Sequence, residues 1–161
     1  MKKQKHNFIY QVYGSANELS EKDFLLLTKA RHATKDAYAP YSNFHVGAAA
    51  QLANGRVITA TNQENASYPA GICSERVLLS AAAALYPAVS IHTIAISYHN
   101  KKGKSNRPVS PCGICRQSLL EYEARFQHPI RIILSGMRGE VYVIPKAGSL
   151  LPLSFTAYDM K

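Results

Sequence analysis

The chain has 161 residues, of which 47% are hydrophobic and 18% are charged, a composition typical of one globular domain with its own core. Its net charge of +9 comes mainly from seven Lys and Arg residues in two stretches without acidic residues, 1–17 and 98–110, which are typical of a solvated tail and loop and do not by themselves indicate a nucleic-acid partner. The longest apolar stretch, residues 78–89, contains Ser80 and Pro87 and is shorter than the roughly 20 residues of a membrane span, so we expect no transmembrane helix.

The first 17 residues are expected to be a basic extension ahead of a domain formed by residues 18–161. Phe8, Tyr10 and Val12 alternate with other residues in a way that would suit an additional edge strand. The extension contains no apolar run of the length found in secretory signals, so a cytoplasmic location is the expectation.

A helix and a hairpin are expected next. Ser20 and Asp23 have the spacing of a capping pair, and apolar residues recur at helical spacing until Pro40. Residues 44–52 and 56–63 are predicted as two antiparallel strands because they flank Asn54-Gly55, a dipeptide favoured in tight turns in which both central residues have positive φ.

The rest of the chain alternates between helices and strands. Helices are expected at residues 73–85, where Ala and Leu dominate, and at residues 112–126, just after Pro111. Residues 91–98, 130–135 and 141–144 are β-branched and apolar and predict strands. This order predicts an α/β fold, a three-layer α/β/α sandwich around a mixed five-stranded sheet.

The three cysteines, Cys73, Cys112 and Cys115, suit a reducing compartment better than a set of disulfides, because their number is odd. Cys112 and Cys115 form a CxxC motif at a helix start, so their sulfurs lie on one side, one turn apart. Cys73 opens the other helix, and helix N-termini favour the thiolate that zinc binds. Three sulfurs on one zinc ion leave the fourth tetrahedral position open for water, which predicts a catalytic site with one Zn²⁺ per chain.

The CxxC motif also has other interpretations. A thioredoxin-like dithiol would leave Cys73 without a role, and half of a zinc ribbon would need a second closely spaced ligand pair. A zinc-stabilised structural or binding module would need a fourth ligand, and none of the six histidines sits beside a cysteine in the sequence.

Glu75 lies two residues after Cys73, roughly 200° around a helix, and is therefore poorly placed as an additional ligand. It can instead stand beside the water and act as general acid and base. A glutamate in the first turn of a helix is also favourable simply because it complements the helix dipole. Taken alone, Glu75 is better explained by this contact with the helix dipole than by a catalytic role.

Four blocks of sequence together resemble the small, homotetrameric, zinc-dependent cytidine deaminases. These blocks are residues 41–48 (YSNFHVGA), 62–68 (NQENASY), 73–76 (CSER) and 111–117 (PCGICRQ), and the likeness extends over about residues 20–158. Zinc deaminases carry an HxE motif followed by PCxxC, and Cys73 takes the place of the histidine, as is usual in the nucleoside branch. The resemblance implies a cytidine deaminase-like fold, a homotetramer, and hydrolysis of cytidine and deoxycytidine to uridine and deoxyuridine with release of ammonia, for pyrimidine salvage.

The resemblance also implies roles for residues around the metal. Glu75 would take a proton from water and deliver it to N3 of cytosine, and backbone groups at Ser74 would read the edge of the base. Ala is the usual residue at this position, so Ser74 departs from the family pattern. The departure has little consequence if only the backbone of Ser74 contacts the base. Phe44 would pack against the pyrimidine, while Asn62 and Glu64 would bind the 3′-hydroxyl of the ribose.

Two aromatic residues are similar to positions through which neighbouring subunits of the family complete each pocket. They are Tyr68, in the second block, and Phe155, in the C-terminal tail.

Arg76 has a physical argument of its own. Three thiolates on Zn²⁺ sum to a net charge of −1, which weakens the metal as a Lewis acid and raises the pKa of its water. A guanidinium beside the sulfurs offsets this charge, so we predict that Arg76 hydrogen-bonds to a ligand sulfur.

Two related activities remain open at this point. One is deamination of another aminopyrimidine nucleoside, such as blasticidin S, against which Glu64 and Arg76 favour cytidine. The other is editing of RNA or DNA, against which the cysteine at position 73 and the ribose-binding block argue, so the expected partner is a small nucleoside and not a nucleic acid.

Overall fold

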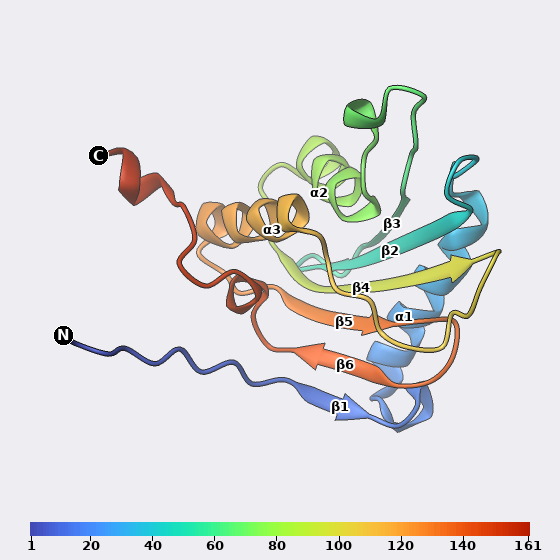
Figure 1. Cartoon of the computed structure of the whole chain (residues 1–161), viewed down its shortest axis with the longest axis horizontal. Helices are drawn as coiled ribbons and strands as arrows, with labels where there is room; N and C mark the ends of the chain where they lie inside the picture. The colour runs from blue at the N-terminus through green and yellow to red at the C-terminus, as the bar shows by residue number, and fades with distance from the viewer.

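A six-stranded sheet forms the middle layer of the computed structural model, which describes all residues from 1 to 161. Helix α1 (Glu21–Ala33) covers one face of the sheet, and α2 (Ser74–Leu85) and α3 (Gly113–Phe126) cover the other (Figure 1). The predicted α/β/α sandwich is therefore confirmed. None of the helices combines the length and the apolar character needed to cross a bilayer.

The sheet is mixed, because only β4 (Ile91–Asn100) and β5 (Arg131–Ser135) run parallel and all other neighbouring strands are antiparallel. The remaining strands are β1 (Gln11–Tyr13), β2 (Phe44–Leu52), β3 (Val57–Thr61) and β6 (Val141–Ile144), and the spatial order is β1-β6-β5-β4-β2-β3. The prediction of five strands is wrong by one. The extra strand is β1 at the sheet edge, with Val12 opposite Tyr142 of β6, where the alternation in the N-terminal extension allowed for it.

The turn between β2 and β3 differs from the predicted one. Only Gly55 has a positive φ, of 81°, so the expectation of positive φ at both Asn54 and Gly55 is wrong. The loop is one residue longer than a two-residue turn: the amide of Gly55 donates to Leu52 O (3.0 Å), and the amide of Leu52 donates to Arg56 O (2.9 Å). The Asn54 side chain accepts from the amide of Arg56 (3.1 Å), which lets asparagine stabilise the turn without a positive φ.

Two helices begin one residue later than predicted, and this places the cysteines. Cys73 and Cys112 have extended backbone angles and are the N-cap residues of α2 and α3, outside the helices themselves. Helix α1 begins at the predicted cap, where the Ser20 hydroxyl accepts from the amide of Asp23 (3.3 Å). It ends before Thr34, whose hydroxyl donates to the carbonyl of Arg31 (2.7 Å).

The core has two parts, one on each face of the sheet. The larger, of 17 buried residues, lies under α2 and α3, and the smaller, of nine, lies under α1. Helix α1 approaches β2 so closely at Gly47 that a Cβ there would lie 2.2 Å from the carbonyl oxygen of Ala30. Gly47 therefore lets α1 pack directly on the strand whose end, at Phe44, reaches the candidate site.

Candidate active site

The three cysteines meet at the N-termini of α2 and α3, although Cys73 is far from the other two in the sequence. Their sulfur atoms all lie within 4.8 Å of one another, with 3.8 Å between Cys73 and Cys112 and 3.5 Å between Cys112 and Cys115. Sulfurs bound to one tetrahedral zinc ion lie about 3.8 Å apart, given Zn–S bonds of about 2.3 Å. The spacing of the three sulfurs therefore fits a single zinc ion.

No fourth side chain joins this group. The cluster of metal-binding atoms consists of the three sulfurs and includes no His, Asp or Glu. A tetrahedral ion held by these three residues keeps one position for an exchangeable ligand, as catalytic zinc sites do. A structural module with a closed four-ligand site is not supported by this arrangement.

The thiols influence each other's protonation. A hydrogen bond from Cys115 lowers the pKa of Cys73 to about 6, and the positive charge of Arg76 contributes in the same direction. The same hydrogen bond, together with burial, raises the pKa of Cys115. The cluster thus holds a thiolate near neutral pH, in the form that zinc binds.

Glu75 is buried, with 5% of its surface exposed, in the first turn of α2. Its carboxylate accepts a hydrogen bond from the hydroxyl of Ser74 (3.0 Å), which is fully buried. The negative charge of Glu75 raises the pKa of both Cys73 and Cys115, so the carboxylate is close to the sulfurs. A buried carboxylate beside a metal site is suited to moving protons there.

Two arginines flank the cysteines in different ways. Arg76 is half-buried and acts on Cys73 through its charge, but the predicted hydrogen bond from its guanidinium to a sulfur is not formed in this structure. Arg116 on α3 donates to the carbonyl of Pro111 (2.8 Å) and to that of Leu150 (2.9 Å). It thereby holds the segment that leads into Cys112, a role that the sequence did not suggest.

A cavity of about 360 Å³ opens beside the cluster. The α2 side contributes Cys73, Ser74 and Glu75, and the opposite side is the end of the sheet, with Phe44 among its residues. Its volume is within the range of small-molecule sites, about 300–1,000 Å³. One pocket thus brings together two of the three metal ligands, Cys73 and Cys112, the buried carboxylate and the aromatic residue that the sequence singled out, while Cys115 lies buried behind it.

Asn62 and Glu64 lie at the outer side of this cavity, where both are already engaged by the protein. The amide of Asn62 bridges two groups of β2: it accepts from the amide of Val46 (2.7 Å) and donates to the carbonyl of Phe44 (3.0 Å). Each end of this amide still has capacity for one more hydrogen bond.

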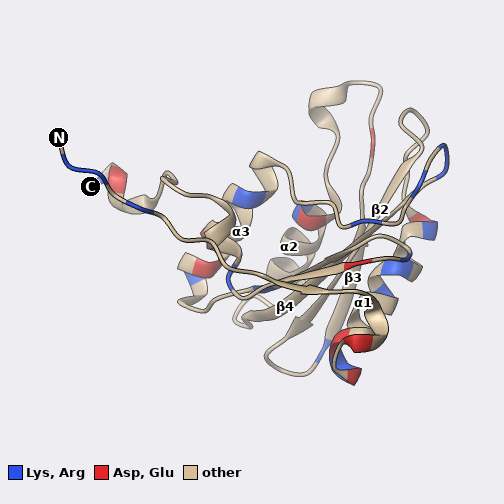
Figure 2. Ribbon diagram, turned by 60° about the horizontal axis from the view of Figure 1, so that its bottom comes forward, with Lys and Arg blue, Asp and Glu red and all other residues tan.

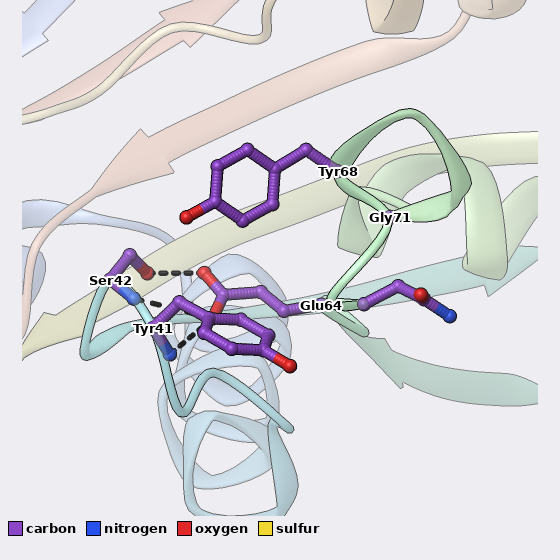
Figure 3. Close-up of a pocket in the computed structure, with 6 residues that line it drawn as sticks. Tyr41, Ser42, Glu64, Tyr68 and Gly71 are labelled. Atoms are coloured by element: carbon purple, nitrogen blue, oxygen red, sulfur yellow. Dashed lines mark hydrogen bonds between the residues drawn. The ribbon is translucent and has the colours of Figure 1, made fainter.

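Glu64 accepts from the backbone amides of Tyr41 (2.9 Å) and Ser42 (3.3 Å) and from the Ser42 hydroxyl (Figure 3). Desolvation alone would raise its pKa, but these hydrogen bonds outweigh it and hold the pKa of Glu64 below its usual value. Glu64 is therefore a fixed, ionised acceptor, and Ser42, to which the sequence gave no role, helps to fix it.

A second hollow of about 400 Å³ adjoins the first and shares Ser42 and Glu64 with it. Tyr68 and Tyr41 form its sides, with their rings edge to face and their centroids 6.0 Å apart (Figure 3). Tyr68 is 75% exposed, and Phe155, at 60%, lines neither cavity. Within one chain these two residues do not reach the cysteine cluster's pocket.

The structure adds one large residue to the pocket that sequence reasoning missed. Tyr98 of β4 lines the cavity and stacks on Phe44. Its position at the end of an apolar strand gave no signal, because the strand register that places it next to Phe44 cannot be read from the sequence.

Comparisons with known proteins agree with this geometry. Residues 20–127 match the family model described as the cytidine and deoxycytidylate deaminase zinc-binding region. A cytidine deaminase of Halalkalibacterium halodurans is 38% identical over 136 residues, which cover 84% of this chain and 96% of the relative. The crystal structure of a cytidine deaminase from Burkholderia pseudomallei is similar with a TM-score of 0.71 and 37% identity, over 85% of this chain and 100% of that one.

A relative with a different activity is more distant. A blasticidin-S deaminase of Bacillus cereus is 27% identical over 140 residues, which cover 86% of this chain and 95% of the relative. The residues that match the family model include the three cysteines and Glu75.

Proposed function

Because the chain belongs to the cytidine and deoxycytidylate deaminase family, we propose that it is a zinc-dependent hydrolase that converts cytidine and deoxycytidine to uridine and deoxyuridine with release of ammonia. One observation carries the proposal: three sulfurs spaced for a single ion lie beside a cavity large enough for a small molecule, which Cys73, Cys112 and the buried carboxylate of Glu75 line. Cys73, Cys112 and Cys115 would hold the metal. When bound there, zinc supplies Lewis-acid chemistry that lowers the pKa of a water molecule.

The protein's own groups would carry the proton transfers. Glu75 takes a proton from the attacking water and delivers it to N3 of cytosine while a bond forms between the water oxygen and C4. The proton of the new C4 hydroxyl then passes through Glu75 to the exocyclic amine, the C4–N bond breaks as the C4 carbonyl forms, and ammonia leaves. The sum is cytidine plus water giving uridine plus ammonia, which needs no redox or nucleotide cofactor.

The other pocket residues would bind and orient the nucleoside. Phe44 offers an apolar surface to the pyrimidine, and backbone groups at Ser74 lie beside Glu75, where they can read the edge of the base. Glu64 and the remaining hydrogen-bonding capacity of Asn62 suit the 3′-hydroxyl of the ribose.

The proposal extends to assembly and cellular role. Tyr68 and Phe155 are exposed aromatic residues, as expected if neighbouring subunits of a homotetramer complete each pocket. Residues 18–161 would form the catalytic domain and residues 1–17 an extension that adds β1. Deamination of free nucleosides would serve pyrimidine salvage in the cytoplasm, with no nucleic-acid partner.

An ultraviolet assay of cytidine with the purified protein, combined with a zinc count per chain, tests the proposal. We expect conversion to uridine, stoichiometric ammonia and one zinc ion per chain. Turnover of blasticidin S but not of cytidine would assign the chain to the more distant activity. Intact zinc with no turnover of any aminopyrimidine nucleoside would contradict an enzymatic role.

A further inference from the structure

Tyr98 forms part of the sheet side of the cavity that contains Glu75. It is 5% exposed and lies directly opposite Val46 in the pairing of β4 with β2. Phe44 is its diagonal neighbour, and the two rings stack with centroids 4.7 Å apart and an interplanar angle of 15°. Diagonal aromatic residues on neighbouring strands are within reach of each other, and here they form one continuous aromatic wall.

The orientation of a bound cytosine follows from the proposed function. Glu75 must reach N3 and the C4 amine, and Ser74 lies next to it, so the polar N3 edge of the ring faces the N-terminus of α2. The C5–C6 edge carries only hydrogen atoms and must then point away from α2, toward the sheet. The strand residues that line the cavity there are mainly apolar, namely Phe44, Val46, Ile96 and Tyr98, with the small side chains of Ser97 and Ser135 among them, and Tyr98 is the largest.

We propose that Tyr98 is a specificity-determining residue that limits the base to pyrimidines without a substituent at C5. This inference rests on the proposed deamination of cytidine at this site. The Tyr98 side chain cannot move aside easily, because Tyr98 belongs to a paired strand and its ring is packed against Phe44. A methyl group at C5 would therefore press against the Tyr98 ring.

Kinetics with cytidine and 5-methylcytidine test the proposal. The unmodified protein should prefer cytidine in kcat/KM by about tenfold or more, the usual effect of one carbon in a tight pocket. Tyr98→Ala should reduce this preference by a similar factor, by improving use of 5-methylcytidine. Tyr98→Phe keeps the ring and should keep the preference. Tyr98→Val, which suits a strand, replaces Tyr98→Ala if that variant does not fold.

Truncation of an aromatic residue away from the cavity distinguishes a loss of base selectivity from a general loosening of the fold. Tyr86 packs against the large core cluster but does not line the cavity, so Tyr86→Ala should leave the ratio of the two kcat/KM values unchanged. The proposal is wrong if the unmodified protein uses both nucleosides equally. It is also wrong if the small Tyr98 variants retain the original ratio or if Tyr86→Ala shifts the ratio as much as they do.

Binding of the corresponding products keeps the test independent of turnover. Calorimetry with uridine and 5-methyluridine should show the same preference for the unsubstituted base, reduced in Tyr98→Ala. If the unmodified protein fails to deaminate cytidine but shows this binding pattern, the proposed function fails and the role of Tyr98 stands. Deamination of cytidine with no effect of Tyr98 on either ratio overturns the role of Tyr98 alone, and the absence of both turnover and product binding overturns both.

Discussion

Glu75 is a buried carboxylate whose only hydrogen bond from a side chain comes from the neighbouring Ser74. Glutamine has nearly the same shape but cannot carry a proton between water, N3 and the amine. Glu75→Gln should therefore lower kcat by about 10²–10⁴-fold and leave zinc bound, because the three sulfurs are untouched. Steady-state kinetics and metal analysis of the same preparation check this prediction.

Cys112→Ala is the matched comparison for that experiment, since it removes one of the three sulfurs and should lose zinc together with activity. Deamination by Glu75→Gln at nearly the original rate would show that another group moves the protons. Loss of zinc from Glu75→Gln would show instead that the carboxylate is a metal ligand.

At the scale of single elements, a second buried carboxylate ties α3 to the far end of the sheet. Glu123 accepts hydrogen bonds from the backbone amides of Ile130 (2.7 Å), Ala147 (3.0 Å) and Gly148 (3.0 Å). Glu123→Ala leaves the amides of Ile130 and Gly148 without an acceptor, whereas that of Ala147 still donates to the carbonyl of Ile130 (2.8 Å), and should lower the free energy of unfolding by about 2–4 kcal/mol, measured by urea denaturation. Glu121→Ala, on the exposed side of the same helix, should change it by less than about 0.5 kcal/mol. Similar effects of the two variants would contradict this role.

The ion pair between α1 and β5 makes stability depend on pH. Burial alone would raise the pKa of Asp23, but hydrogen bonds and the charge of Arg131, 2.6 Å away, lower it. A lowered pKa in the folded state stabilises the protein above the unfolded-state pKa of about 3.9, and this stabilisation is lost as the pH falls through the folded-state value. Asp23→Asn should therefore cost about 1 kcal/mol at neutral pH and progressively less below about pH 4.

Denaturation curves of both proteins at pH 7 and at about pH 3 measure this difference. Asp36 is exposed and has no ion pair, so Asp36→Asn is the control and should differ little from the unmodified protein at either pH. A constant difference between Asp23→Asn and the unmodified protein across this pH range would exclude the ion pair as its source.

The elements could be predicted wherever local pattern decides them. Apolar residues at helical spacing and β-branched runs located all three helices and the five main strands, because side-chain period and propensity act over a few residues. The predictions that failed concern the pairing of distant segments and the backbone conformation of a single residue. The pairing of β1 with β6 joins opposite ends of the chain, and the φ of Asn54 depends on whether the loop has two or three residues.

At the candidate site, too, local sequence pattern predicted some features, whereas others depend on contacts between distant segments. The residue types and the CxxC spacing predicted the metal ligands as a hypothesis, and the fold then brought Cys73 within 3.8 Å of Cys112. Tyr98 was missed because its contact with Phe44 depends on the register of β2 and β4. The hydrogen bond expected from Arg76 is not formed, since charge complementarity alone does not determine the conformation of a long side chain.

At the scale of the whole molecule, Tyr68 and Phe155 are among the most exposed aromatic residues. Tyr68 and Phe155 are 75% and 60% exposed, and the Phe155 carbonyl accepts from Gln117 of α3 (2.9 Å), which holds the tail near the N-terminal half of that helix. If subunits of a tetramer share these residues, Phe155→Ala should lower kcat/KM for cytidine by about tenfold or more and shift the solution mass toward smaller species. Light scattering and kinetics on the same samples check both effects.

Ile9→Ala is a suitable control for that experiment, because Ile9 is 77% exposed but lies in the N-terminal extension. It should leave the mass and the kinetics unchanged. A Phe155→Ala protein with unchanged mass and kinetics would remove Phe155 from the interface.

The net positive charge has a definite place on the molecule. Lys and Arg residues occur along the N-terminal extension and in the loop after β4, while acidic residues lie mostly on the helices, including the short 3₁₀ helices (Figure 2). None of the Lys and Arg residues of these two segments takes part in the ion pair found in the structure, which joins Asp23 and Arg131. All seven of these Lys and Arg residues are exposed, as the sequence suggested.

The edge position of β1 has a consequence for synthesis of the protein on the ribosome. β1 precedes the other strands of the sheet in the chain and pairs with β6, which follows them, so its amides and carbonyls have no partner until β6 has been synthesised. The apolar residues Phe8, Ile9 and Tyr10 just before β1 are exposed during that time, and they stay exposed after the strand has paired. A version of the chain without residues 1–15 would escape this delay and leave β6 uncovered as a permanent edge, open to pairing with another molecule.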